Sequence, residues 1–437
     1  MSISTGTRVV TKGRDVQDLA AEVVVVGSGA AGVMAALTAA RLGRSTLLLE
    51  AGPTVGGQLV GALLGTICGL YTNGPEPRRI TFGPAEDLLA TLHREGVLLA
   101  RRALDTIVLQ YDEGRSGRWA ERALDAAGVT VVTGATLRGV RMEGRRITTL
   151  DVATRWGDLL VRAGGVVDAS GDAAVAWHAG LPVREPEVPQ WGTQMVVLEG
   201  FDEAATSEFD GFRVSEVLRE RGRDYGLVRE DGFVFAFPGC GIAAANLTHM
   251  PNPTEPVGAT RAMLEGRDQA DRVLALLRDA FPASMGRATI RAYGQPGVRQ
   301  TRWFVAAHHL VVEEVRSGHR PEDAIARCSW PVEAHDNAET VSWEVFGPDH
   351  VHWVPLRSLL HRDADNLVAA GRCADADTAA LASIRVMGPC FAMGEAAAHA
   401  LDLAGRGSVH DVSATAIAAR VRDNLEREVR DPWCEGV

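Results

Sequence analysis

The stretch AEVVVVGSGAAGVMAALTAARLGRSTLLLE, residues 21–50, decides the fold that the sequence predicts. It reads as a buried strand, a glycine-rich turn, a helix of small and apolar residues, and a second strand. Gly27, Gly29 and Gly32 have the GxGxxG spacing. The first glycine permits the tight turn, the second lets the backbone approach a pyrophosphate, and the third permits close packing of helix and strand. The stretch therefore predicts a βαβ unit that binds a dinucleotide at the helix N-terminus.

An acidic residue completes this motif. Glu50 ends the second strand, where a carboxylate accepts hydrogen bonds from the adenosine ribose and repels a 2′-phosphate. We expect the cofactor to contact further residues of the turn and of the next loop. These residues are Ser28, Ala30, Ala31, Ala51, Gly56, Gly57 and Gln58.

The motif fits FAD and NAD equally, and three later segments favour FAD. In AGPTVGGQL, residues 51–59, two glycines follow the acid where the chain runs beside the cofactor and needs backbone without side chains. In GGVVDASGDAA, residues 164–174, a strand ends in a Ser-Gly-Asp turn. The segment 366–404 predicts a strand, a helix, and a final helix near Pro389 whose positive end would stabilise negative charge on a reduced flavin.

These segments resemble the FAD-dependent oxidoreductase family within the glutathione-reductase-like flavoprotein superfamily. Besides the fingerprint, the resemblance rests on VDASGDAA (167–174), GVRQTR (297–302), PEDAIAR (321–327) with Glu333 and His335 after it, and the long segment 354–397. It implies bound FAD, with the first glycines at the pyrophosphate and Glu50 at the ribose. The positions it implies along the rest of the cofactor are Ala169, Gly171, Asp172, Gly371, Arg372, Met387, Gly388 and Pro389.

The sequence departs from the family pattern at three places, and these leave the substrate open. Gln300 stands where an acid is common, Trp303 stands where a second arginine is common, and Ala-Asp-Ala follows Cys373.

The fold class that we predict is α/β: a Rossmann-like FAD-binding domain with a central parallel sheet and a small antiparallel insertion, plus an inserted α+β substrate domain. We expect a mobile arm over 1–20, the FAD-binding domain over 21–185 and again over 341–410, the substrate or cap domain over 186–340, and a C-terminal helix over 411–437. Helical spacing over 259–281 predicts a long helix inside the cap.

Because FAD carries the electrons, the protein has to supply binding, orientation and a proton acceptor. His352 and His335 are candidates for the base, with exposed loop histidines as the alternative. Cys68 is a candidate for a covalent flavin link or a redox thiol, although a buried apolar cysteine is the default. No second cysteine is near it, which disfavours a dithiol reductase.

Arginines are the candidates for substrate contact. Arg357 and Arg385 lie in the segment that best matches the family. Arg299 and Arg302 would share one face of a helix and clamp a carboxylate, or form structural ion pairs instead. The pair His308-His309, expected on a helix, lacks metal-ligand spacing, and we predict no metal site.

Composition excludes several classes of protein. A net charge of -11 without a basic run argues against nucleic acid as a partner. Six scattered cysteines without a CxxC pair indicate neither a disulfide framework nor a metal site. No apolar stretch is long enough to span a membrane and no targeting segment is evident, so we expect a cytoplasmic protein.

The leading hypothesis is a flavin dehydrogenase or oxidase that removes hydride from a small polar substrate, such as a carboxylate or an amine, and passes the electrons to an unknown acceptor. A flavin monooxygenase is an alternative, although no second GxGxxG follows a strand. A thiazole-synthase-like enzyme with an ADP-binding fold and a non-catalytic FAD-binding protein are further alternatives. A homodimer is an expectation from the family alone.

Overall fold

A computed structural model describes residues 7, 13–188, 190–205, 211–237 and 239–436. Its largest sheet has the strand order β6-β2-β1-β9-β8-β7, and β22 pairs with β9. The pairs β1·β2, β1·β9, β2·β6 and β9·β22 are parallel, whereas β7·β8 and β8·β9 are antiparallel. The predicted parallel sheet with an antiparallel insertion is therefore confirmed. Its strands are β1 (Val16–Val26), β2 (Thr46–Glu50), β6 (Thr130–Thr133), β7 (Thr136–Glu143), β8 (Arg146–Thr154), β9 (Gly157–Asp168) and β22 (Leu367–Ala369).

The register of the central strands brings the carboxyl ends of three strands to one edge of this sheet. Val26 pairs with Asp168 on one side and with Leu49 on the other. Because parallel strands share their direction, the residues that follow β1, β2 and β9 all emerge at the carboxyl edge, where open α/β sheets bind ligands.

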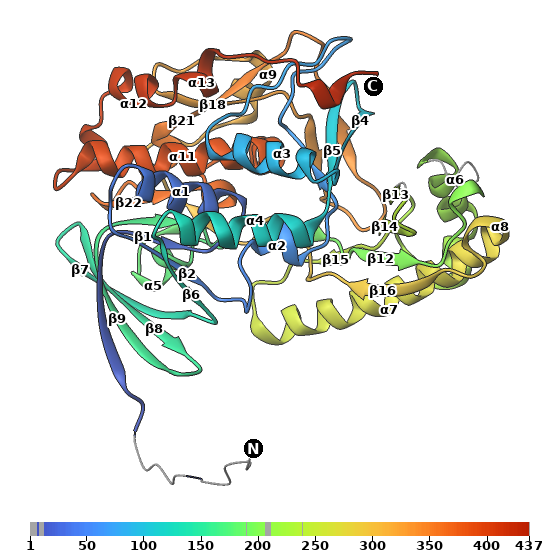
Figure 1. Ribbon diagram of the computed structural model, residues 1–437, viewed down its shortest axis with the longest axis horizontal. Helices are drawn as coiled ribbons and strands as arrows, with labels where there is room; N and C mark the ends of the chain where they lie inside the picture. The colour runs from blue at the N-terminus through green and yellow to red at the C-terminus, as the bar shows by residue number, and fades with distance from the viewer. Residues whose placement is uncertain (1–6, 8–12, 189, 206–210, 238, 437) are drawn as a thin grey trace, which may run out of the picture.

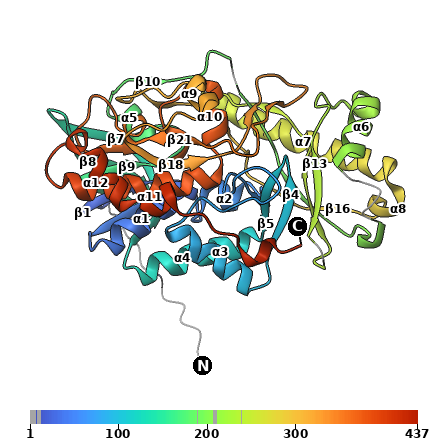
Figure 2. The same cartoon turned by 90° about the horizontal axis from the view of Figure 1, so that it is seen from above.

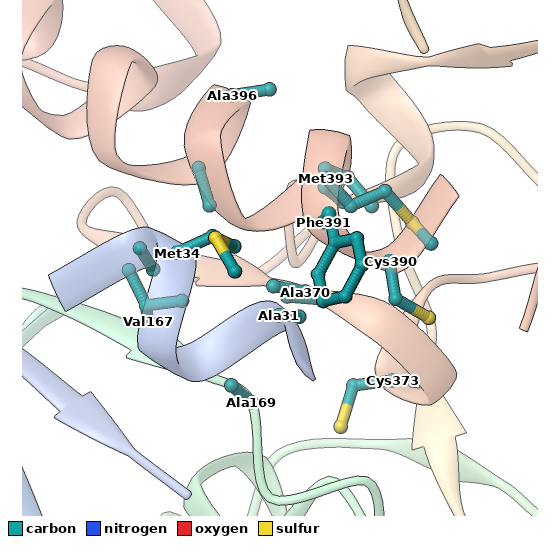
Figure 3. Packing of buried hydrophobic residues seen from close by; sticks show 14 of the residues in the cluster. Ala31, Met34, Val167, Ala169, Ala370, Cys373, Cys390, Phe391, Met393 and Ala396 are labelled. Atoms are coloured by element: carbon teal, nitrogen blue, oxygen red, sulfur yellow. The ribbon is translucent and has the colours of Figure 1, made fainter. Parts of the chain in front are cut away.

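The helix α1 (Ala30–Arg41) packs against α11 (Met387–Ala404), which comes from the far end of the sequence (Figure 1). A Cβ at Gly394 would lie 2.0 Å from the Ala31 carbonyl oxygen, so the two backbones approach as closely as glycine permits. Met34 and Phe391 lie between the two helices (Figure 3), and both are fully buried. This packing ties the C-terminal segment to the dinucleotide-binding unit.

A second core lies apart from the large sheet, beneath the antiparallel sheet β13-β14-β12-β16 (Figures 1 and 2). The predicted long helix is present as α7 (Pro256–Ala280), which contributes Val273 and Leu277 to this core. The strands are β12 (Val196–Glu199), β13 (Phe233–Phe237), β14 (Ile242–Asn246) and β16 (Thr289–Tyr293).

Shorter elements complete the fold. The further helices are α2 (Gly57–Gly61), α3 (Pro84–Arg94), α4 (Glu113–Ala126), α5 (Ala174–His178), α6 (Gly211–Arg221), α8 (Pro282–Met285), α9 (Val312–Ser317), α10 (Thr378–Ile384), α12 (Ala414–Arg420) and α13 (Arg422–Glu426). The further strands are β3 (Thr66–Ile67), β4 (Leu98–Ala103), β5 (Thr106–Tyr111), β10 (Val183–Arg184), β11 (Trp191–Gly192), β15 (Met250–Pro251), β17 (Trp303–Phe304), β18 (Ala324–Cys328), β19 (Val332–Ala334), β20 (Ser342–Glu344) and β21 (His352–Pro355).

Several expectations about the ends of elements need correction. The arm predicted over 1–20 is too long, because β1 begins at Val16 and pairs with β9 from Asp158 onward. Residues 1–6 and 8–12 lie outside the described residues. The single C-terminal helix is wrong: α12 and α13 are two short helices, separated by the non-helical backbone of Val421, and a short 3-10 turn follows at Pro432–Cys434.

Two predicted helices are absent from the described residues. Residues 299–302 and 308–309 form irregular chain between short bridges, where hydrogen bonds to other segments replace the helical ladder. The main core also includes residues 303–332, ahead of the predicted return at 341. The domain boundaries themselves stay a prediction. None of the described helices is long and apolar enough to cross a bilayer.

Candidate active site

The turn after β1 is built so that only glycine fits at two of its positions. Gly27 has a φ of +95°, and a Cβ there would lie 2.4 Å from the Ala169 carbonyl oxygen. A Cβ at Gly32 would lie 1.9 Å from the Gly27 carbonyl oxygen. These contacts hold α1 against the ends of β1 and β9.

The second glycine of the motif faces open space. Gly29 is the N-cap of α1, no side chain caps this helix, and a Cβ at Gly29 would meet nothing within 4 Å. The first N–H groups of the helix, including those of Ala30 and Ala31, have no intrahelical acceptor. Together with the helix dipole, they form an anion site of the kind that binds a pyrophosphate.

Glu50 holds the turn from its far side. Its Oε2 accepts hydrogen bonds from the Ser28 N–H at 2.8 Å and from the Ser28 hydroxyl, and its Oε1 accepts from the Gly52 N–H at 2.6 Å. The residue stays half-buried and Ala51 after it is exposed. The carboxylate is therefore fixed beside the anion site with room for ribose hydroxyls.

A second glycine loop closes over this turn. Gly56 and Gly57 both have positive φ, and a Cβ at Gly57 would lie 2.9 Å from the Gly29 Cα. The Gln58 amide donates to the Val298 carbonyl at 2.9 Å, and the Arg372 guanidinium donates to the same oxygen. Gln58 and Arg372 therefore converge on the loop at Val298, while Gly57 packs against the first glycine turn.

The turn after β9 is ordered by the buried carboxylate of Asp168. It accepts from the Ser170 hydroxyl at 2.6 Å and from the Val175 N–H at 2.8 Å. Burial raises the pKa of Asp168 although these bonds act to lower it. The Asp172 carboxylate, in the same turn, lies 3.6 Å from Arg372 and accepts from Thr301. Gly171 has a positive φ and packs against Arg372.

The far end of the expected cofactor path lies at the start of α11. The Gly388 N–H donates to the Cys68 carbonyl at 2.9 Å, and a Cβ at Gly388 would lie 2.1 Å from the Gly69 carbonyl oxygen. Met387 and Pro389 flank it in the first turn of the helix. Gly371, with a φ of +72°, contacts Ala31 and Cys390.

The family model of FAD dependent oxidoreductases matches residues 22–425. The chain belongs to this family. As an FAD-dependent oxidoreductase it is an enzyme whose cofactor is FAD, and the glycine turns, the uncapped α1 N-terminus and the fixed Glu50 carboxylate fit a dinucleotide. When bound, FAD accepts and passes on a hydride. No curated protein matches the chain.

The chain is also similar to solved structures of low sequence identity. A geranylgeranyl bacteriochlorophyll reductase-like protein from Thermoplasma acidophilum is 12% identical with a TM-score of 0.48, over 94% of this chain and 86% of that one. The p-nitrophenol 4-monooxygenase PnpA from Pseudomonas putida is 11% identical with a TM-score of 0.48, over 93% and 85%. The anhydrotetracycline hydroxylase OxyS from Streptomyces rimosus is 12% identical with a TM-score of 0.44, over 93% and 66%.

In this flavoenzyme, a group of buried and half-buried ionisable side chains adjoins the start of α11. We call it the junction cluster, because its members come from both the α11 side and the segments around the second core. Arg385 ends α10, Glu333 lies in β19, and His335 follows that strand. The complete cluster is Arg229, Asp231, His249, Arg299, Glu333, His335 and Arg385.

Hydrogen bonds hold the acid and the histidines of the junction cluster in place. Glu333 Oε1 lies 2.9 Å from His335 Nε2, and Glu333 Oε2 accepts from the Trp330 indole at 3.1 Å. His335 Nδ1 lies 3.1 Å from His249 Nε2. Burial acts to raise the pKa of Glu333, but the His335 bond and the Arg385 and Arg299 charges hold that pKa at about 2.

Two arginines of the cluster make their hydrogen bonds to neutral groups. Arg299 donates to the Trp191 carbonyl at 2.7 Å and to Thr193, and Arg385 donates to the Glu333 carbonyl at 3.0 Å. In the part of the chain that the structure describes, neither forms an ion pair within 4 Å, and the buried Nε of Arg385 has no hydrogen-bond partner. Burial lowers the pKa of both guanidinium groups.

The other predicted catalytic residues lie outside this cluster. His352 is fully buried, lies 2.9 Å from the Ser383 hydroxyl and 3.2 Å from His350, and burial lowers its pKa to about 3. Arg357 is exposed and pairs with Asp323 at 3.1 Å. Arg302 stacks on the Trp177 ring.

The Cys68 thiol adjoins Glu333, and burial, followed by the Glu333 charge, raises its pKa far above the ordinary range. It is therefore a poor nucleophile. Sequence reasoning missed Arg229 and His249. Neither belongs to a motif, because only the packing of loops around the second core brings them to Glu333, so no local signal marks them.

Proposed function

We propose that the enzyme is a dehydrogenase or oxidase that removes a hydride from a small substrate bearing a carboxylate. The observation that carries this proposal is that Arg299 and Arg385, next to the start of α11, form no ion pair within 4 Å among the described residues, and that the buried Nε of Arg385 has no hydrogen-bond partner. The junction cluster holds three arginines against two carboxylates, Glu333 and Asp231, while burial keeps its histidines neutral by lowering their pKa. A substrate carboxylate would balance the remaining positive charge.

In this mechanism the arginines orient the substrate and the cluster handles its proton. Arg385 has an Nε–H group without an acceptor, Arg299 lies beside it, and the planar guanidinium shape favours a bidentate contact with the carboxylate. Such a contact fixes the reacting C–H bond, which contributes to catalysis through orientation. Glu333 is the ionised acceptor beside it.

The test is a screen for anaerobic bleaching of the purified yellow holoenzyme. Small 2-hydroxy acids and amino acids are compared with their amides and with simple amines and alcohols. We expect bleaching by an acid and at least tenfold weaker reaction with its amide. Bleaching by neutral amines alone would contradict the carboxylate. NAD(P)H consumption with oxygen uptake would point to a monooxygenase instead.

Arg385→Gln supplies the residue-level test. It should raise KM for the acid by roughly 30-fold, about 2 kcal/mol, because the buried carboxylate loses a charged partner. Arg357→Gln is the matched control, since Arg357 is exposed and paired with Asp323. An equal effect of both substitutions would contradict the role of Arg385. The electron acceptor and the homodimer stay predictions.

A further inference from the structure

Three polar contacts run in series through the junction cluster. His249 Nδ1 lies 2.9 Å from the Ala338 carbonyl oxygen, His249 Nε2 lies 3.1 Å from His335 Nδ1, and His335 Nε2 lies 2.9 Å from Glu333 Oε1. Each distance is that of a hydrogen bond, and each bond needs one hydrogen. We call this series the histidine chain.

The histidine chain is one hydrogen short when both imidazoles are neutral. A carbonyl and an ionised carboxylate supply no hydrogen, and a neutral imidazole supplies one. Two histidines therefore supply two hydrogens for three contacts. In each tautomer arrangement at least one of the three contacts then lacks a hydrogen and sets two lone pairs against each other. Uptake of one proton turns all three contacts into hydrogen bonds.

The missing proton can enter at one end only. His249 and His335 are 2% and 1% exposed, whereas the Glu333 side chain is 18% exposed. The Trp330 indole fixes the other carboxylate oxygen, so the carboxylate keeps its orientation. A proton placed on Glu333 is shared with His335 Nε2, and the second hydrogen of the chain then lies on His335 Nδ1 and points to His249.

We propose that Glu333 is the catalytic base of the proposed reaction, and that His335 and His249 are positioning residues that store the proton it receives. The inference rests on the proposed function. The substrate C–H bond breaks with both electrons, which leave as hydride to oxidised FAD, and the substrate O–H or N–H bond breaks as its proton passes to Glu333. A carbonyl or imine product remains.

The charges around the histidine chain favour the unprotonated form before the reaction. Arg229, Arg299 and Arg385 face it from three segments, opposed by Glu333 itself and Asp231, and Cys68 adjoins Glu333. Burial and these arginines lower the pKa of His335 to about 3, although the Glu333 bond acts to raise it. A bound anion offsets the arginines and so raises the affinity of the histidine chain for the one proton that, in the reaction, Glu333 receives from the substrate.

The first test uses trifluoroacetate, which stays ionised throughout the pH range and offers no hydride. Its binding to oxidised holoenzyme is followed from the visible spectrum and by calorimetry between about pH 5 and 8. The protonated histidine chain carries one negative charge fewer and therefore repels the anion less. The affinity for trifluoroacetate should fall by up to about tenfold per pH unit as the histidine chain loses its proton.

Four variants make this test specific. Glu333→Gln adds an amide donor, and His249→Leu removes two of the three contacts. In both variants the remaining contacts have enough hydrogens, so the pH dependence of trifluoroacetate binding should vanish. His249→Gln should retain it, because the amide oxygen accepts from His335 Nδ1 and the deficit persists. His350→Gln is the matched control, since His350 forms a similar histidine pair with His352 that contains no carboxylate.

The outcomes separate this inference from the proposed function. Binding without pH dependence in the wild type, or with unchanged dependence in His249→Leu, overturns the histidine chain and leaves the proposed function standing. No binding at all overturns both.

A second readout follows the proton itself. In one anaerobic turnover in weak buffer with an indicator dye, wild type should release no proton per flavin bleached, and Glu333→Gln and His249→Leu should release one. Stoichiometric release by wild type overturns the inference.

Discussion

At the residue scale, the glycines of the first turn have different physical reasons to be glycine. Gly27 and Gly32 are fixed by backbone contacts within the folded protein, at 2.4 and 1.9 Å from a virtual Cβ. Gly29 has a φ of -63°, which any residue adopts, and space around it. The requirement for glycine at position 29 therefore comes from the approach of the cofactor and not from packing within the protein.

The substitution Gly29→Ala tests this difference. We expect the FAD-free protein to melt at the wild-type temperature, because the new methyl group contacts nothing within the chain. FAD affinity should fall by about tenfold or more, roughly 1.4 kcal/mol, because the methyl group occupies the approach to the helix N-terminus. The measurements are thermal melts of apoprotein and flavin titration. Gly347→Ala, also in open space, is the control. A large loss of apoprotein stability in Gly29→Ala would contradict this explanation.

His352 predicts an acid-dependent loss of stability. Its pKa is about 3 in the folded protein and 6.5 in the unfolded chain, because burial disfavours the charged form. The unfolded state therefore binds a proton first, and the stability that neutral His352 supports is present above pH 6.5 and lost as the pH falls toward 3.

His352→Asn removes this titration. The difference between wild type and His352→Asn in the free energy of unfolding, measured by urea titration, should shrink as the pH falls, by about 1.4 kcal/mol per pH unit between about 6.5 and 3. His178→Asn, at an exposed histidine, is the control. A difference that stays constant over this range would show that His352 is already charged in the folded protein.

At the scale of elements, patterns confined to one segment were predictable. The GxGxxG turn, the acid ending β2, α7 and α11 all follow from local periodicity or spacing, and the structure has them. Helices expected at 299–302 and 308–309 were wrong because long-range bonds decide those segments: Arg299 donates to Trp191, and His309 pairs with Asp375 at 2.7 Å. The junction cluster depends on such pairings, so the sequence indicated only Glu333, His335, Arg299 and Arg385.

Asn366 shows how one side chain joins elements. It is buried just before β22, donates to the carbonyls of Ile147 and Gly164 at 2.9 Å, and accepts from the Ile147 N–H at 2.8 Å. The return segment is thereby attached to β8 and β9.

Asn366→Asp should destabilise the protein by about 2–4 kcal/mol, because it removes both donors and buries a charge beside two carbonyls. Thermal melting with and without FAD measures this effect. Asn337→Asp is the matched control, since half-buried Asn337 accepts from the Glu339 and Thr340 N–H groups through an oxygen that aspartate keeps, and donates only to the exposed Asp336. Equal melting temperatures for the two variants would contradict the joining role of Asn366.

At the scale of the whole molecule, the cofactor and the substrate are assigned to different cores. The glycine turns and α11 belong to the main core, whereas His249 and Arg229 are positioned by the segments around the second core. The junction cluster forms only where both cores hold their loops in place. A destabilising substitution in the second core should therefore weaken substrate binding more than it weakens flavin binding.

A pair of matched leucines tests this organisation. Leu277 on α7 and Leu37 on α1 are 1% and 0% exposed, and Leu→Ala at either should cost about 2–5 kcal/mol in its own core. We expect Leu277→Ala to keep its FAD through gel filtration while trifluoroacetate binding weakens, because the arginine and histidine positions shift. Leu37→Ala should lose FAD, because α1 carries the anion site. If Leu277→Ala released FAD as readily as Leu37→Ala, the two cores would behave as one cooperative unit and the separation of cofactor from substrate would be wrong.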